Sequence, residues 1–148
     1  MDKNKNYTLV STVRVRYEET DRMGVVYNAN YYTWFEIART ELCRYWGIPY
    51  SEWESRGLML PVVESHCRYK HPAMYDQQVQ LWVRVTDVKV HSVTFEYRII
   101  RAEDYKLLAE GWSKRGCTNP EGRLYKQEHP FYLWLVSHSW GEKHPEEA

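Results

Sequence analysis

One stretch of the chain, residues 13–47, changes from a strand pattern to a helix pattern and constrains the fold more than any other. In its first five residues apolar side chains alternate with two arginines, which predicts a strand with one apolar face. A polar turn and a short apolar bend follow. The rest predicts one amphipathic helix, because its apolar residues recur at helical spacing. These residues are Tyr31, Trp34, Phe35, Ala38, Leu42, Tyr45 and Trp46.

Both ends of this helix carry residues that helix ends favour. Asn28 and Asn30 are good N-cap residues, Gly47 stands where a left-handed C-terminal residue belongs, and Pro49 follows it. The turn before the helix holds a carboxylate, Asp21. A helix start presents unpaired N–H groups and the positive end of the helix dipole. An acid or base beside such an oxyanion-binding end is a plausible catalytic pairing.

Beyond residue 58 the apolar residues recur with period two, which predicts strands. The predicted strands cover residues 63–70, 78–85, 93–99 and 105–118. The short links at 71–76, 89–91 and 102–104 predict sequential antiparallel pairing. Five strands with one apolar face need a cover, and the helix is the only long one. The sequence therefore predicts an α+β fold, with a five-stranded antiparallel sheet wrapped around one long helix.

The length of 148 residues indicates a single domain, 1–148, with a core at about 8–118 and a C-terminal extension at 119–148. Residues 48–58 form a connector with one helical turn around Trp53. The apolar segment 129–139 predicts a short helix with Pro130 at its first position, packed on the body or on a partner chain. The tail, 141–148, is polar and is expected to fray.

Charge and cysteine content narrow the function classes. The 20 basic and 20 acidic residues cancel, which argues against binding to nucleic acid. Three cysteines without a CxxC pair indicate reduced thiols, the N-terminus is too polar for a signal peptide, and no run reaches the ~20 apolar residues of a membrane span. We expect a cytoplasmic protein. The six scattered histidines and the lack of a glycine-rich phosphate motif predict no metal and no cofactor.

Two carboxylates have competing interpretations at this point. Asp21 either binds its own turn backbone or acts as a catalytic acid or base. Glu36 lies three residues before Arg39, so a helix-surface ion pair is the simpler interpretation than catalysis.

A longer pattern links these residues to a known family. Residues 17–31 fit every fixed position of Y-x-x-T-D-x-x-G-V-V-Y-x-x-x-Y, residues 36–39 read E-x-A-R, and residues 69–76 read Y-x-x-P-A-x-x-D. Together they resemble the signature of the 4-hydroxybenzoyl-CoA thioesterase-like branch of the hotdog superfamily. The resemblance runs from about residue 12 to residue 118 and implies the hotdog fold.

The resemblance also implies a reaction, the hydrolysis of an acyl-CoA thioester to a carboxylic acid and CoA. In that family the matching residue to Asp21 is the catalytic carboxylate, and a backbone N–H at or near Asn28 polarises the thioester carbonyl. Asp21 would act as general base on water or as nucleophile, and both roles stay open. Asn28 stands where relatives carry histidine, and an amide side chain takes no proton at neutral pH.

Further substrate contacts are implied by the same resemblance. Tyr17, Gly24 and Val25 belong to the motif around the thioester, and Tyr27 and Tyr31 either line the acyl pocket or pack in the core or a dimer interface.

Lys89 and His91 align with residues that meet the phosphates of CoA, and Arg115, Arg123 and Lys126 are further basic candidates. The resemblance implies a homodimer or homotetramer with the site between chains. Two other functions stay open: a thioesterase for acyl-carrier protein, and a non-catalytic hotdog protein that binds an acyl group or a partner.

Overall fold

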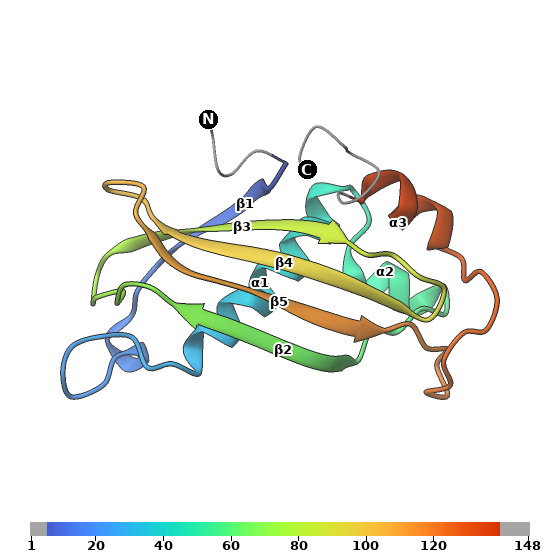
Figure 1. The fold of residues 1–148 in the computed structure, drawn as a ribbon, viewed down its shortest axis with the longest axis horizontal. Helices are drawn as coiled ribbons and strands as arrows, with labels where there is room; N and C mark the ends of the chain where they lie inside the picture. The colour runs from blue at the N-terminus through green and yellow to red at the C-terminus, as the bar shows by residue number, and fades with distance from the viewer. Residues whose placement is uncertain (1–5, 140–148) are drawn as a thin grey trace.

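The computed structural model describes residues 6–139, and in it a five-stranded antiparallel sheet curls around one long helix (Figure 1). The predicted fold is confirmed; the tail, 141–148, lies outside the described residues. The strands are β1 (Thr8–Arg14), β2 (Val62–Tyr69), β3 (Gln78–Thr86), β4 (Ser92–Arg101) and β5 (Leu107–Gly116). The helices are η1 (Tyr17–Glu19), α1 (Asn30–Tyr45), α2 (Tyr50–Ser55) and α3 (Tyr132–His138).

The strands follow the order β1-β3-β4-β5-β2, so one predicted pairing is wrong. β3, β4 and β5 pair in sequence as predicted, but β2 pairs with β5 and not with β3. β1 occupies the edge of β3 that β2 would need, and Val15 exchanges two backbone hydrogen bonds with residues 76 and 77 at the start of β3. The only edge left for β2 is that of β5, and residues 71–76 cross between the two edges instead of forming a hairpin.

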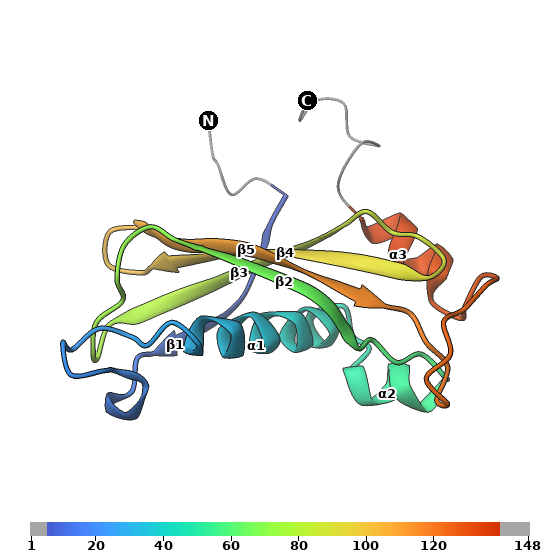
Figure 2. The same cartoon turned by 60° about the horizontal axis from the view of Figure 1, so that its bottom comes forward.

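α1 lies across the concave face of the sheet (Figure 2). Its aromatic face points inward, since Tyr31, Trp34 and Phe35 are buried. Phe35 stacks on Tyr97 of β4, with ring centroids 4.4 Å apart and planes 7° apart. Gly111 of β5 leaves the space for this stack, because a Cβ there would lie 2.9 Å from the Phe35 ring. At the C-terminal end Gly47 donates to Arg44 and Ile48 donates to Cys43, which confirms the predicted Gly47 end.

The C-terminal extension packs on the body, as one of the two predicted alternatives stated. Trp53 of α2 is fully buried, and Phe131 stacks on it at 4.3 Å, while Leu135 of α3 is fully buried. The expected helix start is wrong: α3 begins at Tyr132, with Phe131 as its N-cap. The Phe131 N–H donates to Nδ1 of His129, so a turn across Pro130 precedes the helix.

His129 is expected to make the stability of this extension depend on pH. It is 4 % exposed, and burial lowers its pKa from 6.5 to about 4. Between these values the unfolded chain binds a proton that the folded chain excludes, so stability is complete above about pH 6.5 and falls toward pH 4. The loss by pH 4 is expected to be about 3 kcal/mol.

Urea unfolding of the unchanged protein and of His129→Gln at pH 7.5, 5.5 and 4 measures this effect. The difference between the two proteins isolates His129 from the carboxylates that titrate in the same range. Parallel pH profiles for the two proteins would contradict the prediction.

Candidate active site

A tight loop at residues 20–26 carries the candidate carboxylate. Thr20 and Val26 form an antiparallel bridge that closes the loop. Inside it the Asp21 N–H donates to Val25, the Gly24 N–H donates to Asp21, and the bonds measure 2.9 and 3.0 Å. Gly24 has φ +79°, a conformation that a side chain disfavours. The loop therefore depends on glycine at this position.

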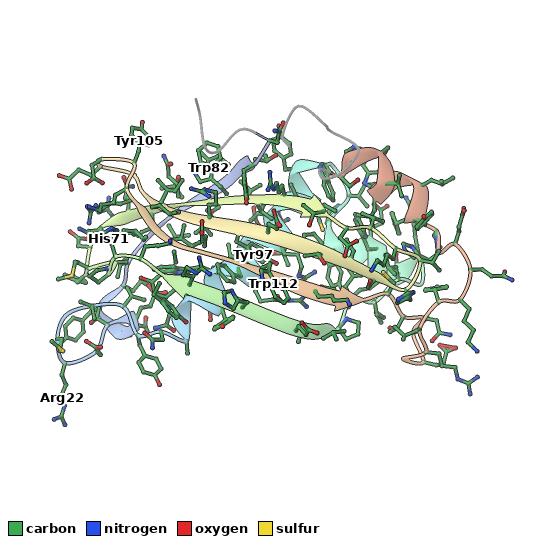
Figure 3. The ribbon with its side chains drawn as sticks, viewed as in Figure 1. Arg22, His71, Trp82, Tyr97, Tyr105 and Trp112 are labelled. Atoms are coloured by element: carbon green, nitrogen blue, oxygen red, sulfur yellow. The ribbon has the colours of Figure 1, made fainter. Side chains whose placement is uncertain are left out.

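The Asp21 carboxylate is exposed, and only one of its two oxygens accepts a hydrogen bond within the described residues. Oδ1 accepts a hydrogen bond of 2.8 Å from the Met23 N–H, which is the turn contact that the simpler interpretation predicted. Oδ2 meets no partner among residues 6–139. One oxygen thus holds the loop while the other stays available for chemistry, so the two interpretations of Asp21 are compatible. Figure 3 shows Arg22, the next residue, projecting outward from the tip of the loop.

The start of α1 lacks the predicted side-chain cap. Ala29 is the N-cap residue, Asn30 is the first helical residue, and no side chain bonds the first N–H groups. Asn30 instead donates its side-chain amide to the carbonyl of Glu19, at 2.8 Å. The N-cap roles predicted for Asn28 and Asn30 are wrong, because the preceding loop captures the Asn30 amide.

Two backbone donors are free directly before the helix. The N–H groups of Asn30, Tyr31 and Tyr32 each bond the carbonyl three residues earlier. The N–H groups of Asn28 and Ala29, both exposed residues, find no acceptor in the described part of the chain. Unpaired donors at the positive end of a helix dipole suit a developing negative charge.

The segment 71–76 packs against this loop and bonds its backbone. The Val26 N–H donates to the Ala73 carbonyl at 2.9 Å, and the Ala73 N–H donates to the Tyr31 hydroxyl at 3.2 Å. Met74 forms a bridge with Val25. His71 lies at the same end of the molecule as Arg22 (Figure 3). The Y-x-x-P-A-x-x-D segment is therefore the platform on which the Asp21 loop rests.

Sequence reasoning missed two residues of this support. Glu19 is buried, and its carboxylate accepts from the Arg16 N–H at 2.7 Å. This bond stabilises η1, the short helix that directly precedes the loop. Tyr69 donates its hydroxyl to the Asn28 carbonyl at 3.2 Å. The tyrosine in the segment at residues 69–76 was the signal available for Tyr69, whereas nothing local distinguished Glu19 from Glu18.

The structure brings some predicted substrate residues together around Asp21. Tyr17 is 78 % exposed and Tyr27 is 59 % exposed, and Val25 is half-buried in the loop itself. Tyr31 is 3 % exposed and packs edge-on against Trp34, so within one protomer it is a core residue. Tyr17 and Tyr27 are thus exposed side chains next to the loop, and their substrate contacts stay a prediction.

Lys89 and His91 lie at the other end of the sheet from Asp21. They sit in the link between β3 and β4, whereas the Asp21 loop lies beside the start of β3 (Figure 1). A strand of nine residues spans about 30 Å, so one protomer does not bring these residues to Asp21. Lys89 lies 3.8 Å from the Asp87 carboxylate.

Glu36 pairs with two arginines. Its carboxylate accepts from Arg39 at 3.1 Å, which confirms the predicted ion pair, and it also pairs with Arg115 of β5. Arg115 is buried and donates to the Leu60 carbonyl. Arg115 is thereby engaged in the interior and is not a surface contact for CoA phosphates.

The described part of the chain contains neither a candidate metal site nor a membrane-spanning helix. No three histidine, cysteine, aspartate or glutamate side chains among residues 6–139 gather in a way that could hold a metal ion. No helix in the same range is long and apolar enough to cross a bilayer. The three cysteines are unpaired, and burial raises the pKa of Cys43 to about 11 and that of Cys117 to about 12.

Comparison with known proteins identifies the family of the chain. The profile of the thioesterase-like superfamily matches residues 15–132. The Bacillus subtilis protein YneP is 38 % identical over 87 residues, which are 59 % of this chain and 63 % of that protein. The acyl-CoA thioester hydrolase YbgC of Escherichia coli is 33 % identical over 108 residues, covering 73 % of this chain and 80 % of that protein.

Among solved structures, the DHNA-CoA thioesterase of Staphylococcus aureus superposes with a TM-score of 0.81 at 27 % identity, covering 95 % of this chain and 94 % of that one. The family match covers most of the chain and includes the Asp21 loop and the start of α1. The chain therefore belongs to the thioesterase-like superfamily and has the hotdog fold.

Proposed function

We propose that this protein hydrolyses an acyl-CoA thioester to a carboxylic acid and free CoA in the cytoplasm. One observation carries the proposal: a carboxylate with a free oxygen, Asp21, lies in the loop that leads directly into the start of α1, where the backbone N–H groups of Asn28 and Ala29 are free. The relative YbgC, named as an acyl-CoA thioester hydrolase, supports the same reaction.

The chemistry matches the groups present. Attack on a thioester carbonyl places negative charge on its oxygen, and backbone donors fixed at a helix start stabilise that charge. One such donor contributes about 3 kcal/mol to the transition state. Asp21 either takes a proton from the attacking water or attacks the carbonyl carbon itself, giving a mixed anhydride that water then cleaves. In both routes the C–S bond breaks and CoA leaves as the thiolate.

A second copy of the chain completes the proposed site. β2 is an edge strand, and all of its residues except Cys67 are exposed. An unpaired edge of this length invites pairing with another strand. Antiparallel pairing of β2 with its copy would bring the Lys89 and His91 end of the partner to the Asp21 end of the first protomer. In a homodimer, alone or within a tetramer, Lys89 and His91 of one chain would thus lie near Asp21 of the other, although they are far from Asp21 of their own chain.

A thiol-release assay with short-chain, long-chain and aromatic acyl-CoAs tests the proposal, together with sedimentation equilibrium of the same sample. We expect turnover of at least one class by a dimer or tetramer. Turnover of acylated carrier protein alone would assign the protein to that substrate instead. Folded, dimeric protein that releases no thiol from any of these would contradict the proposal and favour a non-catalytic binding role.

A further inference from the structure

One carbonyl at the start of α1 accepts two hydrogen bonds. The Asn28 carbonyl accepts from the Tyr31 N–H and from the Tyr69 hydroxyl, both at 3.2 Å. The first bond belongs to the helix, but the second comes from the end of β2, 41 residues along the chain. The helix start, which no side chain caps through its N–H groups, is thus held from its carbonyl side.

Tyr69 is well fixed for this contact. Its ring meets the Tyr31 ring edge-on, with centroids 5.1 Å apart, and Tyr31 is itself buried. Loss of solvent around the hydroxyl raises the pKa of Tyr69, and the neighbouring Cys67 and Tyr32 raise it further. A tyrosine hydroxyl is protonated at neutral pH even at its ordinary pKa of about 10, so it acts as a donor there.

The bond acts on the same peptide unit that carries one of the free donors. The Asn28 carbonyl and the Ala29 N–H belong to one planar peptide group, so a donor on the oxygen orients that plane. Hydrogen bonds in series also polarise one another, which makes the Ala29 N–H a stronger donor. The direction of the neighbouring Asn28 N–H is set by the same backbone turn.

We propose that Tyr69 is a positioning residue, whose hydroxyl holds the Asn28–Ala29 peptide so that the free N–H groups at the start of α1 face the thioester oxygen. This inference rests on the proposed function. Tyr69 acts through the backbone and does not touch the reacting atoms. It also links the site to β2, the strand whose outer edge is open to a second copy.

Tyr69→Phe tests the proposal, because it removes the hydroxyl and keeps the ring contact with Tyr31. We expect kcat to fall about tenfold, less than the ~10²-fold loss from removing an oxyanion donor outright, while KM changes less than about twofold. Tyr125→Phe is the matched control. It removes another tyrosine hydroxyl that donates to a backbone carbonyl, that of Gly57 at 2.6 Å, at the end of the molecule away from Asp21.

Tyr125→Phe is expected to lower the thermal midpoint at least as much as Tyr69→Phe and to leave kcat unchanged. Equal effects of the two variants on kcat, or an effect of Tyr69→Phe on KM alone, would overturn the proposal.

A second readout reports the donors directly. In the Asp21→Asn background, Raman difference spectra of bound benzoyl-CoA record the C=O stretch, which hydrogen bonding to the oxygen lowers. Adding Tyr69→Phe is expected to move this band back toward its value in solution, and an unmoved band would overturn the proposal. Absence of turnover by the unchanged protein would count against the proposed function, whereas turnover that is insensitive to Tyr69→Phe counts against this inference alone.

Discussion

Asp21→Asn is expected to lower kcat/KM for acyl-CoA hydrolysis about 10³-fold. A positioned acid or base contributes of this order, and the amide of asparagine neither takes a proton from water nor attacks the carbonyl. The loop itself should persist, because an amide oxygen can still accept the bond from the Met23 N–H that Oδ1 accepts in the structure. Steady-state thiol release with the best acyl-CoA of the panel measures the change.

Glu18→Gln is the matched control for Asp21→Asn. Glu18 is a carboxylate three residues earlier, exposed and paired, among residues 6–139, only with Arg16. Its removal is expected to change kcat/KM less than about twofold, since exposed ion pairs contribute little. An Asp21→Asn protein that hydrolyses acyl-CoA as fast as the unchanged protein would refute the catalytic role of Asp21.

Gly111→Ala is expected to have the largest effect on stability, a loss of about 3 kcal/mol. A Cβ at Gly111 would lie 2.1 Å from the His66 carbonyl oxygen and 2.9 Å from the Phe35 ring. The backbone of β2 cannot yield without breaking its ladder with β5, and the ring is held by its stack on Tyr97. For a chain of 148 residues this loss corresponds to a fall of about 10 °C in the thermal midpoint.

Gly116→Ala makes the same substitution five residues along the same strand. There the nearest heavy atom is Cδ2 of the exposed Leu124 side chain, at 3.2 Å, which can rotate away. We expect Gly116→Ala to cost less than about 1 kcal/mol. Urea unfolding measures the loss of unfolding free energy in both variants. Equal losses would contradict the prediction, because they would mean that the clash at Gly111 costs no more than the contact at Gly116.

Features that depend on neighbouring residues were predicted well. The two periodicities identified α1 and the strands β2 to β5, since they reflect which face of a local element is apolar. The first strand was misplaced: the alternation at residues 13–17 predicted it there, but β1 covers Thr8–Arg14 and Tyr17 begins η1. Gly47 was assigned correctly, because it completes a turn of a few residues at the end of α1. The Asp21 loop was located by the motif at residues 17–31, and the family match agrees with that motif.

Features that depend on distant partners were missed. The N-cap prediction for Asn30 failed because Glu19, 11 residues earlier, captures its amide. The β2–β3 pairing failed because β1 already occupies that edge of β3. Lys89 was aligned with CoA-binding positions, but its distance from Asp21 follows from the direction of β3, which no local pattern reports.

The sequence by itself thus determined the elements of this protein, its wrapped-sheet fold class and the loop that carries Asp21. These follow from side-chain periodicity and from turn residues that act within a few positions. Only the tertiary structure decided that β2 pairs with β5, that the start of α1 keeps two free N–H groups, and that Tyr69 reaches the Asn28 carbonyl. Each of these depends on which edges and acceptors remain once the rest of the chain has paired, and that competition is settled across the whole molecule.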